Sequence, residues 1–331
     1  MVDDLPLRRA FVTGGTGFVG ARLCASLLAS KVFVVASSRS HQPASAVTWV
    51  QLELPDAPQP EALREVDVVF HLAARAHAVA TSHADENLYE RVNEQGSIQM
   101  ARAAVAAGVR RFVLVSSVKA MRAPGELQLA ETDPGVPVDP YGLSKRRAEL
   151  GVRAAAEGSG MDVVVLRPAL LYGPGVKGNL ATLLGSLARG RRPPLPDVQN
   201  RRSLLGLVDF VEAAKTCSIR PEASGRTYVL TDGQTYSTRR IVDGLAGGLG
   251  VDATPRFRIP LPVLTAAARV GDLAIKVSGR RAPFDTAALD KLVGNADYAS
   301  EAIRAELGFT TLVTLEDEAA EIARAALARE L

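Results

Sequence analysis

The sequence predicts an α/β protein with a doubly wound parallel sheet and a smaller C-terminal lobe. Short runs rich in β-branched residues alternate with longer helical stretches through the first half of the 331-residue chain. A glycine-rich turn follows the first of these runs. Beyond Leu171 the alternation fades and Pro and Gly interrupt the sequence, which is typical of a lobe built from excursions off a sheet.

Each element of the first half has its own sequence signal. The β-branched runs predict strands at Arg9–Thr13, Lys31–Ala36, Val47–Leu52, Val66–Leu72, Arg111–Ser116 and Asp162–Arg167. Helices are expected at Gly17–Ala29 and Glu86–Ala107, and a third from Pro140 to about Gly158, with Asp139 as its N-cap. The segment 226–230 is expected to return to the sheet as a further strand, and Thr314–Leu331 to form a helix.

Composition excludes several classes of protein. Hydrophobic residues make up 47% and charged residues 23% of the chain, as in ordinary globular proteins. The net charge of +3 gives no indication of a nucleic-acid groove. Cys24 and Cys217 are the only cysteines and have no partners at metal-ligand spacing, so we expect neither a disulfide nor a metal site. A reducing, cytoplasmic location is therefore expected.

The longest apolar run, Leu261–Val277, is interrupted by Arg269, Asp272 and Lys276. Because these charges break the run, we expect no membrane span here. The pattern instead predicts an amphipathic helix that packs against the protein body.

The run from Thr13 to Gly20 indicates dinucleotide binding, because it lies between the first strand and the first helix. Gly14 permits a tight turn, Gly17 lets a pyrophosphate approach the backbone, and Gly20 allows close helix packing. The helix N-terminus offers free N–H groups to phosphate. The expected cofactor contacts in this loop are Gly14, Thr16, Gly17, Phe18, Val19 and Gly20. We therefore expect residues 1–171 to form a dinucleotide-binding Rossmann domain.

The end of the second strand bears on the choice of cofactor. An acidic residue there would bind the ribose 2′-hydroxyl of NAD, but the sequence has Ser38 and Arg39. Two hydroxyls and a guanidinium in the run Val35–Ser40 suit a 2′-phosphate, which favours NADP(H) over NAD(H). The alternative is that Arg39 points to solvent and NAD(H) is bound.

Tyr141 and Lys145 are four residues apart on a predicted helix, so they share one face. Lowering the pKa of a tyrosine from about 10 to about 7 requires roughly 4 kcal/mol. An ammonium about 4 Å away supplies an interaction of that order at an effective dielectric of about 20. Ser117 follows the strand Arg111–Ser116, where doubly wound sheets bind ligands, and is expected to hold a substrate oxygen. We expect Ser117, Tyr141 and Lys145 to be catalytic, and Ser117 and Tyr141 to contact the substrate.

These motifs together resemble the extended short-chain dehydrogenase/reductase family, specifically its nucleotide-sugar epimerases and reductases. The matching segments are Thr13–Gly20, Asp67–Ala74, Asn93–Gly96, Ser116–Ser117, Tyr141–Lys145, Leu166–Pro168 and Tyr172–Gly175. The resemblance implies that Tyr141 is the acid/base, that Lys145 lowers its pKa and binds the nicotinamide ribose, and that Ser117 orients the sugar oxygen. It implies further cofactor contacts at Glu53, Leu54, Leu72, Ala73, Ala74 and Pro168, and substrate contacts at Asn179, Leu180 and Arg202.

By the same resemblance, residues 172–331 mainly form a nucleotide-sugar-binding lobe. Val118 and Lys119 stand where the family's 4,6-dehydratases have an Asp-Glu pair, so dehydration is not expected. Segments of the C-terminal lobe are similar to members acting on UDP-N-acetylhexosamines in polysaccharide synthesis. We therefore expect C4 reduction of a UDP-4-keto-6-deoxy-N-acetylhexosamine, giving a UDP-N-acetylquinovosamine or fucosamine product. The alternatives are a UDP-sugar 4-epimerase and, from another class, a non-catalytic dinucleotide sensor. A homodimer through the helices Glu86–Ala107 and Tyr141–Glu157 is also implied.

Overall fold

A computed structural model gives the fold of the chain. It describes residues 4–75, 83–122, 128–132, 135–137, 139–191, 196, 198–252, 259–278, 282 and 284–330, and within these ranges the side chains of 83–85 and 329–330 are not described.

The centre of the molecule is a seven-stranded parallel sheet. Its strands are β1 (Arg9–Thr13), β2 (Phe33–Ser38), β3 (Thr48–Gln51), β4 (Val68–His71), β5 (Arg111–Val115), β6 (Asp162–Pro168) and β9 (Thr227–Leu230). They lie in the order β3-β2-β1-β4-β5-β6-β9. This order reverses direction between β1 and β4, which confirms the doubly wound Rossmann architecture.

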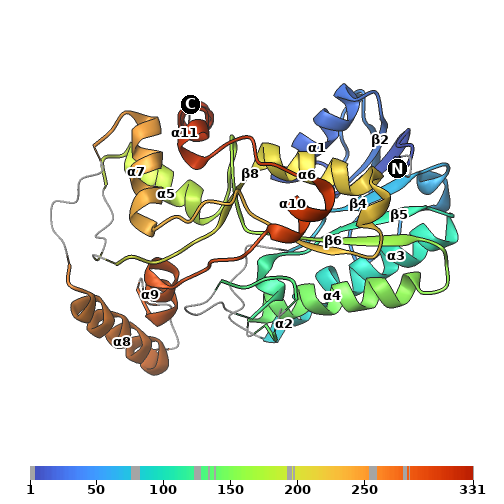
Figure 1. Ribbon diagram of the computed structural model, residues 1–331. Helices are drawn as coiled ribbons and strands as arrows, with labels where there is room; N and C mark the ends of the chain where they lie inside the picture. The colour runs from blue at the N-terminus through green and yellow to red at the C-terminus, as the bar shows by residue number, and fades with distance from the viewer. Residues whose placement is uncertain are drawn as a thin grey trace.

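Helices cover both faces of the sheet (Figure 1). On one face lie α1 (Phe18–Ala29) and α6 (Leu207–Ile219), where Leu27 and Phe210 share a core cluster with buried strand residues. On the other face lie α3 (Gly96–Ala106) and α4 (Pro140–Ala156), where Met100 and Val152 pack with Phe112. The strands are buried on both sides and therefore read as nearly continuous apolar runs.

The single helix expected at Glu86–Ala107 is interrupted. The structure has α2 (His83–Tyr89), then a wide π turn at Glu90–Gln95, and then α3. Asn93 lies in the π turn and is fully buried. Its amide donates to Ser144 Oγ at 2.9 Å and to the Arg75 carbonyl, and its oxygen accepts from the Arg75 N–H at 2.8 Å. Asn93 thus fastens the segment after β4 to helix α4.

The C-terminal lobe has a core of its own. A two-stranded parallel sheet, β7 (Leu170–Tyr172) and β8 (Leu204–Gly206), leads into it. Helices α5 (Asn179–Ala188), α7 (Thr238–Leu249) and α11 (Leu315–Glu330) supply Leu184, Leu245 and Leu315 to its centre. Two later segments return to the first domain: β9 pairs with β6, and α10 (Glu301–Leu307) packs Ile303 into the main core.

Two further helices, α8 (Leu261–Ser278) and α9 (Thr286–Val293), lie at the far end of this lobe (Figure 1). Leu264 and Ala268 of α8 form a small cluster with Leu289 of α9. The expectation that α8 packs against the protein body is wrong for much of its surface, because apolar residues such as Val270 face outward. Among the described residues, no helix has both the length and the apolar character needed to cross a membrane.

Candidate active site

The turn after β1 is built for close backbone approach. Gly14 has a φ of +68°, which favours glycine, and its N–H donates to Ser37 Oγ at 3.2 Å. The Gly15 N–H donates to the Ser37 carbonyl at 3.0 Å, and a Cβ on Gly15 would lie 2.7 Å from that of Ala36. A Cβ on Gly20 would collide with the Gly14 carbonyl oxygen. Sequence reasoning identified the roles of Gly14 and Gly20, but it did not foresee the hydrogen bonds to Ser37 that join this turn to β2.

The N-terminus of α1 is open to an anion. Gly17 is the N-cap residue and, without a side chain, makes no cap hydrogen bond. Thr16 is exposed, whereas the side chains of Phe18 and Val19 pack against the cores of the two lobes. Phe18 and Val19 therefore offer backbone N–H groups rather than side chains. An uncapped helix N-terminus beside a glycine turn fits a dinucleotide pyrophosphate.

The end of β4 borders the glycine turn. Thr13 Oγ1 accepts from the N–H groups of Leu72 and Ala73, both at 2.9 Å, and lies 3.0 Å from His71 Nδ1. A Cβ on Gly14 would lie 3.2 Å from the Ala73 backbone. Ala74 follows directly and is half-buried. These predicted cofactor residues lie side by side with the glycine loop.

The other expected cofactor residues are spread along the carboxyl edge of the sheet. Glu53 is exposed just after β3, and Leu54 is half-buried against Gly96 of α3. Pro168 is buried and ends β6. Leu54 therefore packs under a helix, while Glu53 faces solvent.

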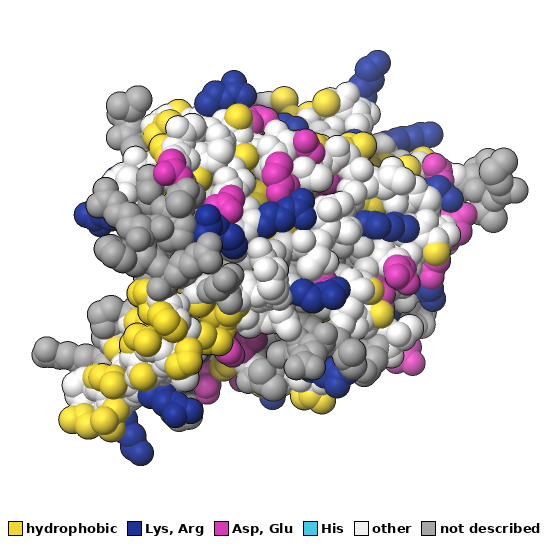
Figure 2. Space-filling model, turned by 60° about the vertical axis from the view of Figure 1, so that its left-hand side comes forward, with side chains coloured by type: hydrophobic (Ala, Val, Ile, Leu, Met, Phe, Trp, Pro, Cys, Tyr) yellow, Lys and Arg dark blue, Asp and Glu magenta, His cyan; other side chains and the backbone are white. Residues whose placement is uncertain are grey.

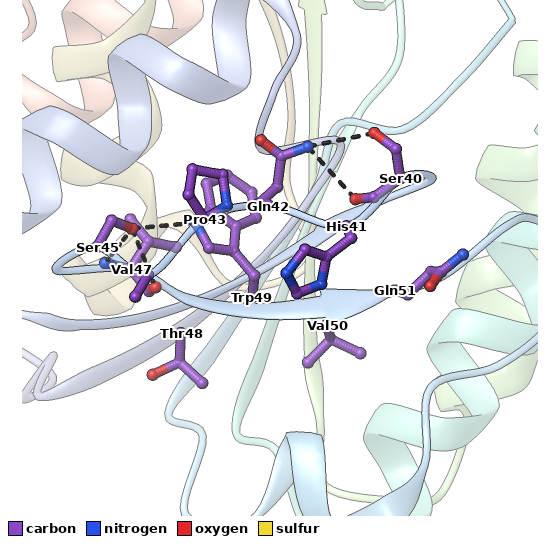
Figure 3. A pocket seen from close by; sticks show the side chains of 11 residues that line it. Ser40, His41, Gln42, Pro43, Ser45, Val47, Thr48, Trp49, Val50 and Gln51 are labelled. Carbon is purple, nitrogen blue, oxygen red and sulfur yellow. Dashed lines mark hydrogen bonds between the residues drawn. The ribbon is translucent and has the colours of Figure 1, made fainter.

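Ser38 ends β2 and Arg39 follows it, directly before the segment 40–51 that lines a hollow of about 450 Å³. Ser38 Oγ already accepts from the Ser40 N–H at 3.3 Å and from Gln42 Nε2 at 3.2 Å. Arg39 is exposed. The hollow is lined by residues of 40–51, with the rings of His41 and Trp49 labelled in Figure 3. It lies at the adenosine end expected for the cofactor and not at Tyr141.

Ser117, Tyr141 and Lys145 come together where β5 ends. The Ser117 side chain lies beside the Tyr141 phenol and lowers its pKa. Asp139 caps α4 by accepting the Gly142 N–H at 2.9 Å, which fixes Tyr141 in the first helical turn. One turn later Lys145 is buried, and its Nζ donates to the Val115 carbonyl at 2.6 Å.

Burial shapes the ionisation of this group. Burial raises the pKa of Tyr141 to about 12, and the Ser117 side chain opposes that rise. Burial lowers the pKa of Lys145 to about 8, against the opposing charge of Glu149. Burial therefore sets the pKa of Tyr141 in the protein alone, and the lowering of that pKa by Lys145 stays a prediction. The phenol is therefore neutral and ready to donate its proton.

A buried ion pair behind Lys145 was missed by sequence reasoning. Glu149 accepts from Ser116 Oγ at 2.5 Å and from Arg167 Nη2 at 2.6 Å and Nε at 2.9 Å. Glu149 and Arg167 are both nearly inaccessible to solvent. The signal that could have identified Glu149 is its spacing four residues after Lys145, on the same helix face.

Tyr89 is a second residue that the sequence did not single out. It is buried in α2, and its ring centroid lies 5.9 Å from that of Tyr141, with the planes tilted by 60°. Such a tilted arrangement is favourable for aromatic pairs. Tyr89 thereby limits where the Tyr141 ring can lie. An aromatic residue within an amphipathic helix carries no sequence mark of such a contact.

The three expected substrate residues occupy different environments. Asn179 is exposed at the first position of α5, whereas the Leu180 side chain is buried in the lobe core and leaves only its backbone for a ligand. Arg202 Nη2 donates to the Lys291 carbonyl at 2.5 Å, but its buried Nε has no partner in the part of the chain that the structure describes. An unpaired guanidinium donor fits an anionic ligand. Burial raises the pKa of Tyr298 to about 12; the charge of Asp139 adds to this rise and that of Arg202 opposes it.

Comparison with known proteins identifies the family. The model of the NAD dependent epimerase/dehydratase family matches residues 10–230. A UDP-glucose 4-epimerase of Vibrio cholerae is 34% identical, over 76% of this chain and 78% of that protein. A 2-alkyl-3-oxoalkanoate reductase of Stenotrophomonas maltophilia is 27% identical, over 93% of this chain and 96% of that protein.

A solved structure has the same fold. The UDP-glucuronic acid 4-epimerase of Bacillus cereus, in complex with UDP-glucuronic acid and NAD, superposes with a TM-score of 0.78 at 18% identity. The alignment covers 97% of this chain and 99% of that chain. On the family match and the fold together, the chain belongs to the NAD-dependent epimerase/dehydratase family and is an enzyme of the extended short-chain dehydrogenase/reductase type.

Proposed function

We propose that this enzyme is a nucleotide-sugar 4-epimerase acting on a UDP-hexose or UDP-N-acetylhexosamine. The observation that carries the proposal is the placement of Ser117 beside the Tyr141 phenol at the end of β5, with the buried Lys145 one helical turn after Tyr141. A relative named UDP-glucose 4-epimerase at 34% identity supports this choice of reaction.

Binding is assigned to the two lobes separately. The open N–H groups at the start of α1 hold the pyrophosphate of a nicotinamide dinucleotide. Residues 172–331 mainly supply the UDP-sugar contacts, with Arg202 offering its guanidinium to the diphosphate and Asn179 an amide donor. The sugar ring then lies between the lobes, facing Tyr141.

Proton transfer is assigned to Tyr141. A nicotinamide dinucleotide, when bound, supplies hydride exchange at the sugar C4 carbon. Ser117 Oγ holds the C4 oxygen, while Tyr141 removes its hydroxyl proton. After the 4-keto sugar has rotated to present the other face of C4 to the hydride, Tyr141 returns the proton to the C4 oxygen. The raised pKa of Tyr141 favours the return step. Removal of the proton depends on positive charge nearby, which Lys145 provides while it is protonated.

A second candidate is the C4 reductase of a UDP-4-keto-6-deoxy-N-acetylhexosamine. The observation that favours it is the exposed Arg39 at the end of β2, where NAD enzymes have an acid, because a guanidinium there suits NADP(H). A cofactor that is consumed must exchange with solution. In this case Tyr141 protonates the C4 oxygen once, and no return step occurs. The related protein from Stenotrophomonas maltophilia is also named a reductase.

The deciding experiment follows product and cofactor together. The purified enzyme is incubated with UDP-glucose or UDP-N-acetylglucosamine and NAD, and the sugars are identified by NMR while nicotinamide absorbance is recorded. An epimerase gives the C4 epimer without net change in absorbance. If the enzyme instead consumes a UDP-4-keto sugar together with NADPH and does not interconvert the hexoses, the reductase is established. The double variant Ser117→Ala/Tyr141→Phe controls for contaminating activity.

We also propose that the enzyme is cytoplasmic and that it forms a homodimer through the outer surfaces of helices α2 and α4. Leu150 on α4 and Leu88 on α2 are large apolar side chains exposed at 58% and 39%. Both cysteines are buried free thiols, as suits a reducing compartment. Sedimentation of the Leu150→Glu variant tests the dimer, because a charge at the subunit contact should yield monomers. An unchanged dimer would show that the α4 surface around Leu150 is not the contact.

A further inference from the structure

Helix α8 has two apolar faces, and only one of them is covered. Leu264, Ala268 and Gly271 form the stripe that packs on α9 and the segment before it. The other apolar face carries four large side chains at high exposure: Val263 56%, Val270 66%, Leu273 61% and Val277 80%. Residues 263, 270 and 277 repeat every seven positions, with Leu273 between them, so these side chains lie together along the helix.

Figure 2 shows this face as the largest gathering of hydrophobic side chains in that view, on the helix that projects from the molecule. Lone exposed apolar residues are ordinary, but a contiguous patch marks an interaction surface. The patch lies apart from the catalytic group and is not explained by the proposed reaction.

The charges on α8 indicate what covers the patch. Arg269 and Lys276 are exposed, and their seven-residue spacing places them along one polar flank of the helix. In Figure 2, Lys and Arg groups border the outer part of the patch, and Asp and Glu groups border its inner side. Asp272, the only acidic residue of the helix, turns toward α9 and accepts the Thr286 N–H at 3.1 Å. The outward surface of α8 is therefore apolar and cationic.

We propose that α8 docks onto the surface of an anionic lipid bilayer, lying in the plane of the interface. An amphipathic helix with Lys and Arg on its polar flank binds such surfaces, because the apolar side chains enter the headgroup region and the cations meet lipid phosphates. The stems of Arg269 and Lys276 can extend along the apolar face and keep their charges at headgroup level.

A second copy of the chain is a poorer occupant of this face. Pairing two α8 helices through Val270 and Leu273 brings Arg269 and Lys276 of both copies to the same contact. Within the helix no outward acid is available to neutralise them, since Asp272 is engaged with α9. Like charges at such a contact oppose association.

The test is co-sedimentation of the full enzyme with vesicles. Vesicles of phosphatidylcholine alone are compared with vesicles containing phosphatidylglycerol. We expect sedimentation only with the anionic vesicles, weakened by added salt. The variants Val270→Gln/Leu273→Gln and Arg269→Glu/Lys276→Glu should each reduce the bound fraction at least about tenfold. Circular dichroism should stay unchanged, because all four side chains are exposed.

Leu312→Gln is the matched control, since Leu312 is 65% exposed but lies outside α8, and it should sediment like the unaltered enzyme. Equal binding to neutral and anionic vesicles, or full binding by either double variant, would overturn the proposal. A dimer that Val270→Gln/Leu273→Gln converts to monomers would assign the face to a second copy and would also overturn it. Catalytic activity does not enter these measurements, so they are independent of the proposed reaction.

Discussion

Removing the buried carboxylate behind the catalytic lysine should strongly destabilise the fold. In Glu149→Gln the side chain keeps its size but loses its charge, while Arg167 remains nearly inaccessible to solvent. The two guanidinium hydrogen bonds of 2.6 Å and 2.9 Å would then meet a neutral partner. Breaking a buried ion pair from one side costs about 3–5 kcal/mol, because the remaining charge stays buried without compensation.

The assay is the free energy of unfolding from urea denaturation. Asp243→Asn is the control, because the pair Arg239–Asp243 has a similar distance of 2.8 Å but is exposed on both sides. That substitution should cost less than about 1 kcal/mol. The double variant Glu149→Leu/Arg167→Met should recover much of the loss, since it removes both buried charges. A loss for Glu149→Gln no larger than that of the control would refute the reasoning.

Three further predictions concern activity. Turnover should fall as pH rises through about 8, where Lys145 loses its proton. In Glu149→Gln the midpoint of this fall should move to lower pH, because Glu149 raises the pKa of Lys145. An unmoved midpoint in the pH–rate profile would contradict this. Arg39→Ala should weaken NADPH more than NADH in a fluorescence titration, and equal weakening would reject the phosphate contact. Arg202→Ala should raise the substrate KM with little change in kcat, whereas an unchanged KM would remove Arg202 from the diphosphate site.

The sequence predicted the Rossmann sheet because each strand is a short apolar run bounded by turns. Arg9–Thr13 was predicted with its observed bounds. The second strand begins later than expected, at Phe33, because Lys31 has a φ of +60° and cannot belong to a strand. The π turn inside Glu86–Ala107 was missed. It coincides with hydrogen bonds from the Asn93 side chain to residues distant in the sequence, and hydrophobic periodicity gives no sign of such bonds. The three-residue strands β7 and β8 are too short for any periodic signal.

The candidate site was predictable where local spacing carries the chemistry. The four-residue spacing of Tyr141 and Lys145 and the glycine run Thr13–Gly20 are both local patterns. In the structure both segments lie at the same edge of the sheet. Long-range effects were not predictable. The pKa of Tyr141 depends on burial between elements distant in the sequence, and the Glu149–Arg167 pair joins α4 to β6. The outward face of α8 likewise depends on which of its two apolar faces α9 covers.

Tyr141 moves the substrate proton in the proposed reaction, and the variant Tyr141→Phe tests this role most directly. Turnover of the preferred UDP-sugar should fall by about 10²–10⁴-fold, the range typical of a general acid–base group. Cofactor affinity, measured on the same preparation by titration, should stay nearly unchanged because the ring and its contact with Tyr89 remain. Undiminished turnover with intact cofactor binding would contradict the account.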